Sequence, residues 1–201
     1  MIAFQAAAWV SAALTAMVVA RIASRNAGTL GSVLAGMLYL AILPMFGGAG
    51  GQSPVFYNLW MALAALGVVR ALPALRRGRL PRVLYAAMGS AGFAITFKQT
   101  AVCEAVFLGC FVLWELRRAG MPLPRIGAVA MGLALTGAAP MLVFAAFYAG
   151  AGHFAEFWHA MVTSNLTKTY NAGDDAGMRI IGLTLLFLPA LLLALFGIAL
   201  T

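Results

Sequence analysis

The chain has 201 residues, of which 64% are hydrophobic and 9% are charged, and its mean hydropathy is +0.97. Soluble domains carry roughly 25% charged residues, so this composition excludes an ordinary soluble domain and predicts a membrane protein. The formal net charge is +8. The arginines stand in short segments between apolar runs and form no basic face interleaved with aromatic residues, which argues against a nucleic acid partner. The partner that the composition predicts is the lipid bilayer.

Apolar runs separated by polar or basic segments predict about seven membrane crossings. The first three and the last two predicted spans cover residues 2–20, 28–46, 55–71, 126–150 and 180–200. Two further crossings come from the stretch between the third and sixth spans. The sequence therefore predicts an all-α, polytopic transmembrane helical bundle that forms a single domain over residues 1–201.

Residues 83–116 supply the fourth and fifth spans. Only Lys98, Glu104 and Glu115 are charged in these 34 residues. A single helix of that length would be ~50 Å long, well beyond the ~30 Å hydrocarbon core of a bilayer. The stretch is therefore predicted to cross twice, as a re-entrant-like helical hairpin with Lys98-Gln99-Thr100 at its corner. Each arm has only about 17 residues, which places the corner at or slightly below the membrane surface.

The basic residues divide unequally between the two sides of this predicted topology. One side carries Arg21, Arg25, Arg70, Arg76, Arg77, Arg79, Arg82, Arg117, Arg118 and Arg125. The other side carries Lys98, Lys168 and Arg179. The positive-inside rule makes the side with ten arginines cytoplasmic. The Lys98 corner and the loop over residues 150–179 are then expected outside.

Glu104 is the second charged residue of the hairpin. It follows Thr100 by four residues, so the two share a helix face, and it lies ~9 Å deeper than Lys98. Ionisable groups at membrane depth are candidates for function and are expected to face protein or a water-filled cavity. The alternatives are a lysine that snorkels to the surface and a glutamate that is protonated or locally paired.

Proline and glycine predict bends and close packing in the later spans. Pro140 and Pro189 interrupt the sixth and seventh spans, where a missing N–H is expected to bend each helix. Small residues let transmembrane helices approach closely. Glycines with this expected packing role are Gly89, Gly92, Gly127, Gly132 and Gly137.

The external loop over residues 150–179 contains an amphipathic segment. Its apolar residues recur at helical spacing and are Phe154, Phe157, Trp158, Met161 and Val162. This stripe predicts an interfacial helix that lies in the membrane surface. A second face carries Glu156, His159 and Thr163, which would contact a head group or meet water. His153 and His159 are six residues apart, ~240° around a helix, so they do not share a face and no metal site is expected.

The run Gly92-Phe-Ala-Ile-Thr-Phe-Lys98-Gln99-Thr100-Ala101 resembles the G-L-A-x-x-T-K-x-T-A stretch of bacterial GT-C membrane glycosyltransferases. These enzymes are relatives of protein mannosyltransferases and lipid A aminoarabinose transferases, glycosyltransferase families 39 and 83. Residues 154–170 resemble their external loop, and residues 52–58 resemble the start of one of their helices. The resemblance implies a multi-pass protein of the bacterial inner membrane. It also implies transfer of a sugar from a polyprenyl-phosphate donor to an acceptor at the periplasmic face.

The resemblance also implies roles for particular residues. Lys98 would approach the donor phosphate, and Gln99 and Thr100 would add hydrogen bonds. Glu104 would hold Lys98 or an acceptor group through water. The residues expected to form a lid are Trp158, His159, Asn165 and Tyr170. No cofactor is expected other than the lipid-linked sugar, and no divalent metal.

This chain departs from the family in one respect. The family keeps its catalytic carboxylate in the first external loop, whereas the first predicted span here runs in the direction of the family's second span. No catalytic residue is therefore expected within the chain, which is interpreted as a piece of the transmembrane domain that is inactive alone. Two alternatives stay open. One is a transporter or permease in which Glu104 couples protons and the proline bends act as hinges. The other is a non-catalytic scaffold in which Lys98 and Glu104 only fix helix packing.

Overall fold

The computed structural model describes residues 2–46 and 52–167, together with residues 177, 178, 181, 182, 184, 185, 188 and 192. Every regular element in these ranges is a helix, which confirms the predicted all-α class. The chain divides into two compact units, Met1–Phe157 and Trp158–Thr201. Each unit is described by itself.

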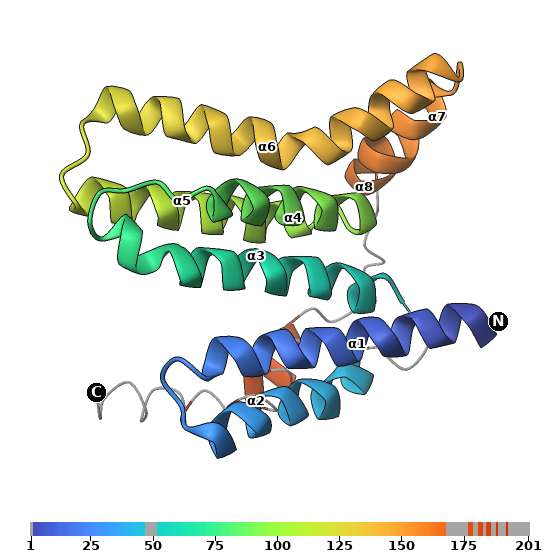
Figure 1. Cartoon of the computed structure of the whole chain (residues 1–201). Coiled ribbons are helices and arrows are strands. Elements are labelled where there is room, and N and C mark those ends of the chain that lie inside the picture. The colour runs from blue at the N-terminus through green and yellow to red at the C-terminus, as the bar shows by residue number, and fades with distance from the viewer. Residues whose placement is uncertain are drawn as a thin grey trace. The chain divides into compact units, whose positions relative to one another are not determined.

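The first unit is built from long helices joined by short connections (Figure 1). They are α1 (Ile2–Ala23), α2 (Thr29–Ile42), α3 (Ser53–Leu75), α4 (Val83–Phe97), α5 (Ala101–Arg118) and α6 (Leu123–Gly150). The 3-10 turn η1 (Leu43–Phe46) extends α2, and the short helix α7 (Phe154–Trp158) follows α6.

Within the described residues, α1, α3 and α6 are long and apolar enough to cross a membrane. They correspond to the first, third and sixth predicted spans. The apolar helices α2 and α4 are shorter, and the predicted seventh span over residues 180–200 lies largely outside the described residues. The structure thus supports a helical membrane protein, and a bundle of seven crossings stays a prediction.

Glycines in a left-handed backbone conformation end α3 and α5. Gly78 has φ +68° and Gly120 has φ +87°, a region that costs a residue with a Cβ atom. In each case the next residue donates its N–H to the carbonyl five residues back, from Arg79 to Ala74 and from Met121 to Leu116. This is the Schellman pattern, which satisfies the last carbonyls of a helix and turns the chain sharply. The two connections can therefore be short.

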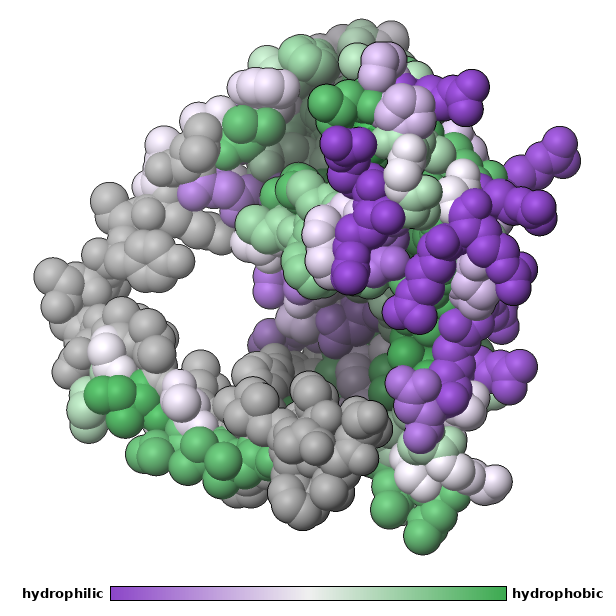
Figure 2. Space-filling view, turned by 90° about the vertical axis from the view of Figure 1, so that its left-hand side faces the viewer, coloured by the Kyte–Doolittle hydropathy of each residue, from purple (hydrophilic) through white to green (hydrophobic). Residues whose placement is uncertain are grey.

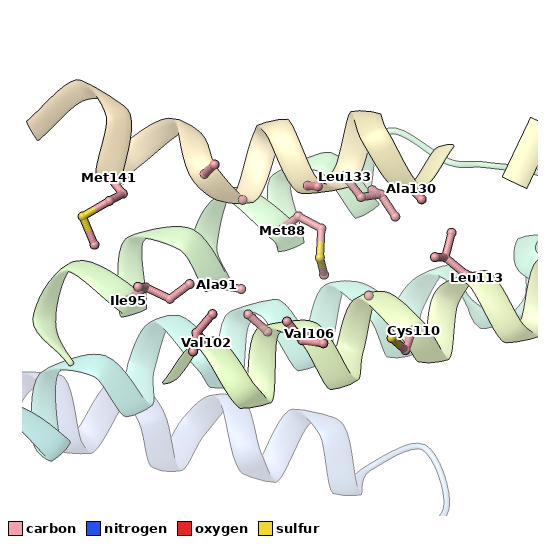
Figure 3. A pocket seen from close by; sticks show the side chains of 15 residues that line it. Met88, Ala91, Ile95, Val102, Val106, Cys110, Leu113, Ala130, Leu133 and Met141 are labelled. Atoms are coloured by element: carbon pink, nitrogen blue, oxygen red, sulfur yellow. The ribbon is translucent and has the colours of Figure 1, made fainter. Parts of the chain in front are cut away.

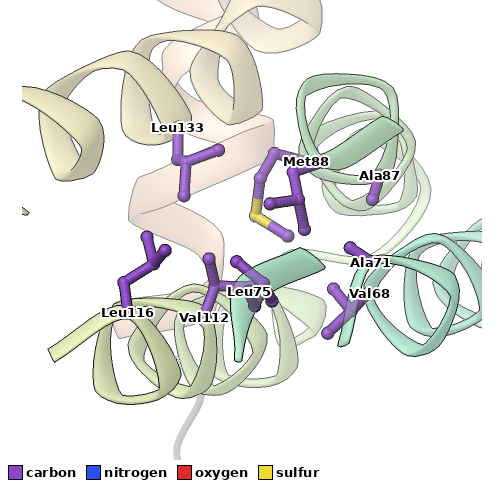
Figure 4. Packing of buried hydrophobic residues seen from close by; sticks show 9 residues of the cluster. Val68, Ala71, Leu75, Ala87, Met88, Val112, Leu116 and Leu133 are labelled. Carbon is purple, nitrogen blue, oxygen red and sulfur yellow. The ribbon is translucent and has the colours of Figure 1, made fainter. Parts of the chain in front are cut away.

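The core lies where α4 packs against α3, α5 and α6. Its largest cluster contains Val68, Ala71, Leu75, Leu84, Ala87, Met88, Val112, Leu116 and Leu133. Figure 4 shows side chains from all four helices meeting in this cluster. On the other side of α3, helix α1 packs between α2 and α3. The hairpin of α4 and α5 thus packs against two long helices, α3 and α6.

Helices α4 and α6 come into backbone contact at two glycines. A Cβ atom placed on Gly92 would lie 1.8 Å from the carbonyl oxygen of Gly137, so no side chain fits there. A Cβ on Gly127 would meet nothing within 4 Å. The predicted packing role is therefore confirmed at Gly92 and not at Gly127. Pro140 lies inside α6, and Figure 1 shows this helix bent, whereas Pro189 lies outside the described residues.

The two ends of the first unit differ in charge. All ten arginines assigned to the cytoplasmic side are exposed. They belong to the ends of α1, α3 and α5, the starts of α4 and α6, and the connections between them. These segments lie together at the left of Figure 1, and Figure 2, which views that end, shows hydrophilic side chains gathered there. Lys98 lies at the opposite end of α4.

Candidate functional site

The connection between α4 and α5 is the corner that the sequence predicts at Lys98-Gln99-Thr100. Lys98 leaves the helix in an extended conformation, with φ −151° and ψ 115°. Its N–H donates to the carbonyl of Ala94, and its own carbonyl accepts the N–H of Ala101, both at 3.1 Å. The corner is therefore a hydrogen-bonded turn rather than an open loop, and it gives the backbone of Lys98 a defined place.

The ammonium of Lys98 lies over an aromatic ring. Its Nζ atom is 5.3 Å from the ring centroid of Tyr57, in the first turns of α3, within the ~6 Å range of a cation–π contact. Next to Tyr57, the side-chain amide of Asn58 donates to the hydroxyl of Tyr39 from α2 at 3.3 Å. Tyr39, Tyr57, Asn58, Lys98 and Glu104 are called the corner cluster below. Sequence reasoning missed its two tyrosines, although Tyr57 lies in the segment 52–58 that carries part of the family resemblance.

Glu104 lies in the first turn of α5. Its side chain is exposed rather than enclosed by protein. The buried stripe of α5 runs through Ala101, Val112 and Leu116, and Glu104 lies at the edge of this stripe. It interacts electrostatically with Lys98 and with the hydroxyl of Tyr57. Lys98 and Glu104 are not within direct ion-pair distance among the described residues, so any closer link between them needs a bridging group.

The other two predicted phosphate ligands flank Lys98. Gln99 is partly buried and Thr100 is exposed. Thr100 directly precedes α5, and its side chain makes no capping hydrogen bond to that helix. Its hydroxyl therefore does not cap the start of the helix. The structure brings Lys98, Gln99, Thr100 and Glu104 together at one end of the hairpin.

An apolar groove opens beside this corner, between α4, α5 and α6 (Figure 3). Its volume is about 450 Å³. The lining contains Met88, Ala91, Ile95, Val102, Ala105, Val106, Gly109, Cys110, Leu113, Ala130, Leu133, Ala134, Gly137, Ala138 and Met141. None of these side chains is charged or carries a hydroxyl or amide group. We call this cavity the α4–α6 groove.

The α4–α6 groove begins close to the corner and runs along the hairpin. Ile95 and Val102, which stand three residues before and four residues after Lys98, both line it. On α5 its lining extends from Val102 to Leu113, ~17 Å along the helix. One end of an elongated apolar cavity therefore adjoins a cationic turn.

The loop over residues 150–179, which the sequence predicts to be external, begins with a helical segment. Helix α7 continues into the π-helical turn η3 (His159–Thr163) and then α8 (Ser164–Leu166). In the first unit, Nδ1 of His153 lies 3.6 Å from Oε1 of Glu156. The pKa of Glu156 is lowered by a hydrogen bond from its own backbone N–H and, to a smaller extent, by His153. No three potential metal ligands among His, Cys, Asp and Glu gather within the described ranges.

The residues of the predicted lid lie in the second unit. Trp158 and His159 are exposed there, and the side-chain amide of Asn165 donates to the carbonyl of Met161 at 3.2 Å. Tyr170 lies outside the described residues. A lid over the corner cluster stays a prediction.

Protein-family models, curated proteins and solved structures were compared with this chain, and none of them matches it. Its function is therefore inferred from the residues and geometry of the site.

Proposed function

We propose that this chain is the part of a GT-C-type glycosyltransferase that binds the polyprenyl-phosphate donor. In this proposal it crosses the bacterial inner membrane several times, with the corner cluster at the periplasmic face. The observation that supports the proposal is that the Lys98 turn adjoins one end of an elongated apolar groove, through Ile95 before it and Val102 after it. A lipid-linked sugar donor needs both features, because it joins an anionic phosphate to a long hydrocarbon chain.

Each part of the site suits one part of such a donor. A lysine ammonium is a compact positive charge that binds phosphate well, and hydrogen bonds to a charged group are stronger than neutral ones. Gln99 and Thr100 stand beside it and would add neutral donors. The α4–α6 groove would take the first isoprene units, since it offers only apolar surface to them.

The same lysine would also assist the reaction. When the sugar leaves the carrier, negative charge grows on the departing phosphate, and a positioned cation stabilises that charge in the transition state. The ring of Tyr57 holds the ammonium on one side by a contact of 5.3 Å, which limits its freedom before the donor arrives. The group that activates the acceptor is not assigned to this chain.

Binding of a short polyprenyl phosphate tests the proposal. The purified chain in nanodiscs would be titrated with farnesyl phosphate and, separately, with the uncharged alcohol farnesol. Lys98→Ala should weaken farnesyl phosphate binding about 10-fold to 100-fold, the equivalent of ~1.5–3 kcal/mol for a hydrogen bond to a charged group. Farnesol binding should change little. Val106→Trp, which fills the groove, should weaken both ligands.

Arg125→Ala is the matched control, because it removes a positive charge from the start of α6, at the opposite end of the unit from Lys98. Equal affinity of Lys98→Ala and the unchanged chain for farnesyl phosphate would refute the proposal. Proton-dependent solute uptake into liposomes without use of a lipid-linked sugar would instead favour the transporter. Loss of thermal stability alone in a Lys98→Ala, Glu104→Ala double variant would favour the scaffold.

A further inference from the structure

A second cleft lies at the arginine-rich end of the first unit, away from the corner cluster. It has a volume of about 710 Å³ and lies between the connection that follows α1 and the last turns of α3. Its lining contains Ile22, Arg25, Asn26, Val69, Leu72, Pro73, Arg76 and Arg77. Three guanidinium groups and one amide thus share a cleft with four apolar residues. We call it the arginine cleft.

Pro73 explains why Arg25 is held in this cleft. Proline has no N–H, so Pro73 leaves the carbonyl of Val69, four residues earlier in α3, without its helical donor. A guanidinium N–H of Arg25, Nη1, donates to that carbonyl. The contact joins the connection after α1 to α3 and fixes the guanidinium on the cleft wall. A guanidinium has five N–H donors, so one bond to Val69 leaves others for a ligand.

Arg76 is held from the other side by α5. Its Nε atom lies 3.6 Å from Oε2 of Glu115, whose side chain is 8% exposed while that of Arg76 is 69% exposed. The contact anchors the inner part of the arginine and leaves its outer part accessible. Among the described residues, neither Arg25 nor Arg77 has a carboxylate within ion-pair distance. The cleft therefore keeps a positive charge that the described helices do not neutralise.

The composition of the cleft indicates the chemistry of its ligand. Guanidinium groups form strong, often bidentate hydrogen bonds with phosphate oxygens. Basic pockets between transmembrane helices on the cytoplasmic side bind anionic lipid head groups. Ile22, Val69 and Leu72 add apolar surface that free phosphate would not use, whereas the start of an acyl chain would.

We propose that the arginine cleft binds the phosphodiester head group of an anionic phospholipid, of the phosphatidylglycerol or cardiolipin class. This site is separate from the corner cluster and does not depend on the proposed glycosyltransferase activity. It also differs from general attraction of surface arginines to the membrane, because two of its arginines are fixed by contacts within the protein. Arg79 and Arg82 are exposed nearby and do not line the cleft.

Lipid retention measured by native mass spectrometry tests this proposal. The purified chain would be titrated with phosphatidylglycerol, with zwitterionic phosphatidylcholine and with inorganic phosphate. Arg77→Gln is the main variant, since Arg77 lines the cleft and removing its charge breaks no ion pair among the described residues. Arg82→Gln is the control with the same charge change outside the cleft. Arg77→Gln should weaken phosphatidylglycerol binding roughly fivefold, the equivalent of ~1 kcal/mol per basic residue.

The control should change this affinity less than twofold, and phosphatidylcholine should bind weakly to all forms. Adding Arg25→Gln to Arg77→Gln should weaken binding further if the double variant still melts cooperatively, and Arg77→Gln alone decides the matter if it does not. Equal losses in Arg77→Gln and Arg82→Gln would overturn the site in favour of general surface attraction. Equal retention of phosphatidylcholine, or displacement of the lipid by millimolar phosphate, would also overturn it.

Discussion

Replacing Gly92 by alanine tests the packing on which the first unit depends. The new methyl group would lie 1.8 Å from the carbonyl oxygen of Gly137 and 2.7 Å from its carbonyl carbon. Both atoms belong to the backbone of α6, so no side chain can rotate away. Ordinary van der Waals contact begins at about 3.4 Å, and the two helices would have to move apart until the first distance has nearly doubled.

The expected cost follows from this displacement. Overpacking a filled site costs typically ~1–3 kcal/mol, and contact with rigid backbone places Gly92→Ala at the upper end, about 3 kcal/mol. For a chain of this size ~1 kcal/mol corresponds to roughly 2–4 °C in the melting temperature. We therefore expect Gly92→Ala to lower the melting temperature of the detergent-solubilised chain by about 6–12 °C.

Thermal melting followed by circular dichroism would measure this change. Gly127→Ala is the matched control, because it makes the same substitution in α6 at a position with nothing within 4 Å. Alanine is the better helix former by up to ~1 kcal/mol, so the control should melt at the same temperature or slightly higher. If Gly92→Ala and Gly127→Ala melted together, the contact between α4 and α6 would not exist as described.

Two further pairs of residues give predictions that can be checked by similar means. Arg76→Ala should lower the melting temperature more than Glu115→Gln. The first change leaves a buried carboxylate without its partner, whereas the second removes the charge of Glu115 and keeps the shape of its side chain. The reverse order of melting temperatures would contradict the ion pair. Since the folded-state pKa of Glu156 is lowered, its contribution to stability is complete above the ordinary glutamate value and is lost as the pH falls through the folded-state value. An NMR titration should therefore show a lower midpoint for Glu156 in the unchanged chain than in His153→Ala. Identical midpoints would contradict the interaction between His153 and Glu156.

The hairpin could be predicted from the sequence because length alone decided it. The apolar run is too long for one crossing, and two crossings fit only if both are short. The turn must therefore lie near the middle of the run. The lysine and its two polar neighbours lie near the middle of the run and are poorly suited to the membrane interior, and the structure ends α4 at Phe97, directly before them. The end of α3 was harder to predict. The sequence suggested a span that stops at residue 71, whereas the helix continues through Pro73 to Leu75.

The contacts that define the two sites could not be predicted, because they join residues far apart in the sequence. Lys98 meets Tyr57 and Arg25 meets the carbonyl of Val69, and neither pair follows from local spacing. Helix α3 continues past Pro73, and Arg25 donates to the Val69 carbonyl that the proline leaves without its helical N–H. The exposure of Glu104 likewise depends on which side of α5 its neighbours cover. These contacts and exposures arise from the packing of helices against one another and cannot be predicted from the sequence of any single helix.

The unequal lengths of the helices around the groove have a consequence for the surrounding lipid. Helix α4 has 15 residues and rises only ~22 Å, whereas α6 has 28 residues and rises ~42 Å. Where both helices cross the bilayer, as the sequence predicts, the bilayer is expected to thin beside the hairpin, at a modest energetic cost per ångström of mismatch. The resulting dimple would lower the polar layer toward Lys98, so that under the proposed function a carrier lipid would bring its charged end to Lys98 without being lifted out of its own leaflet.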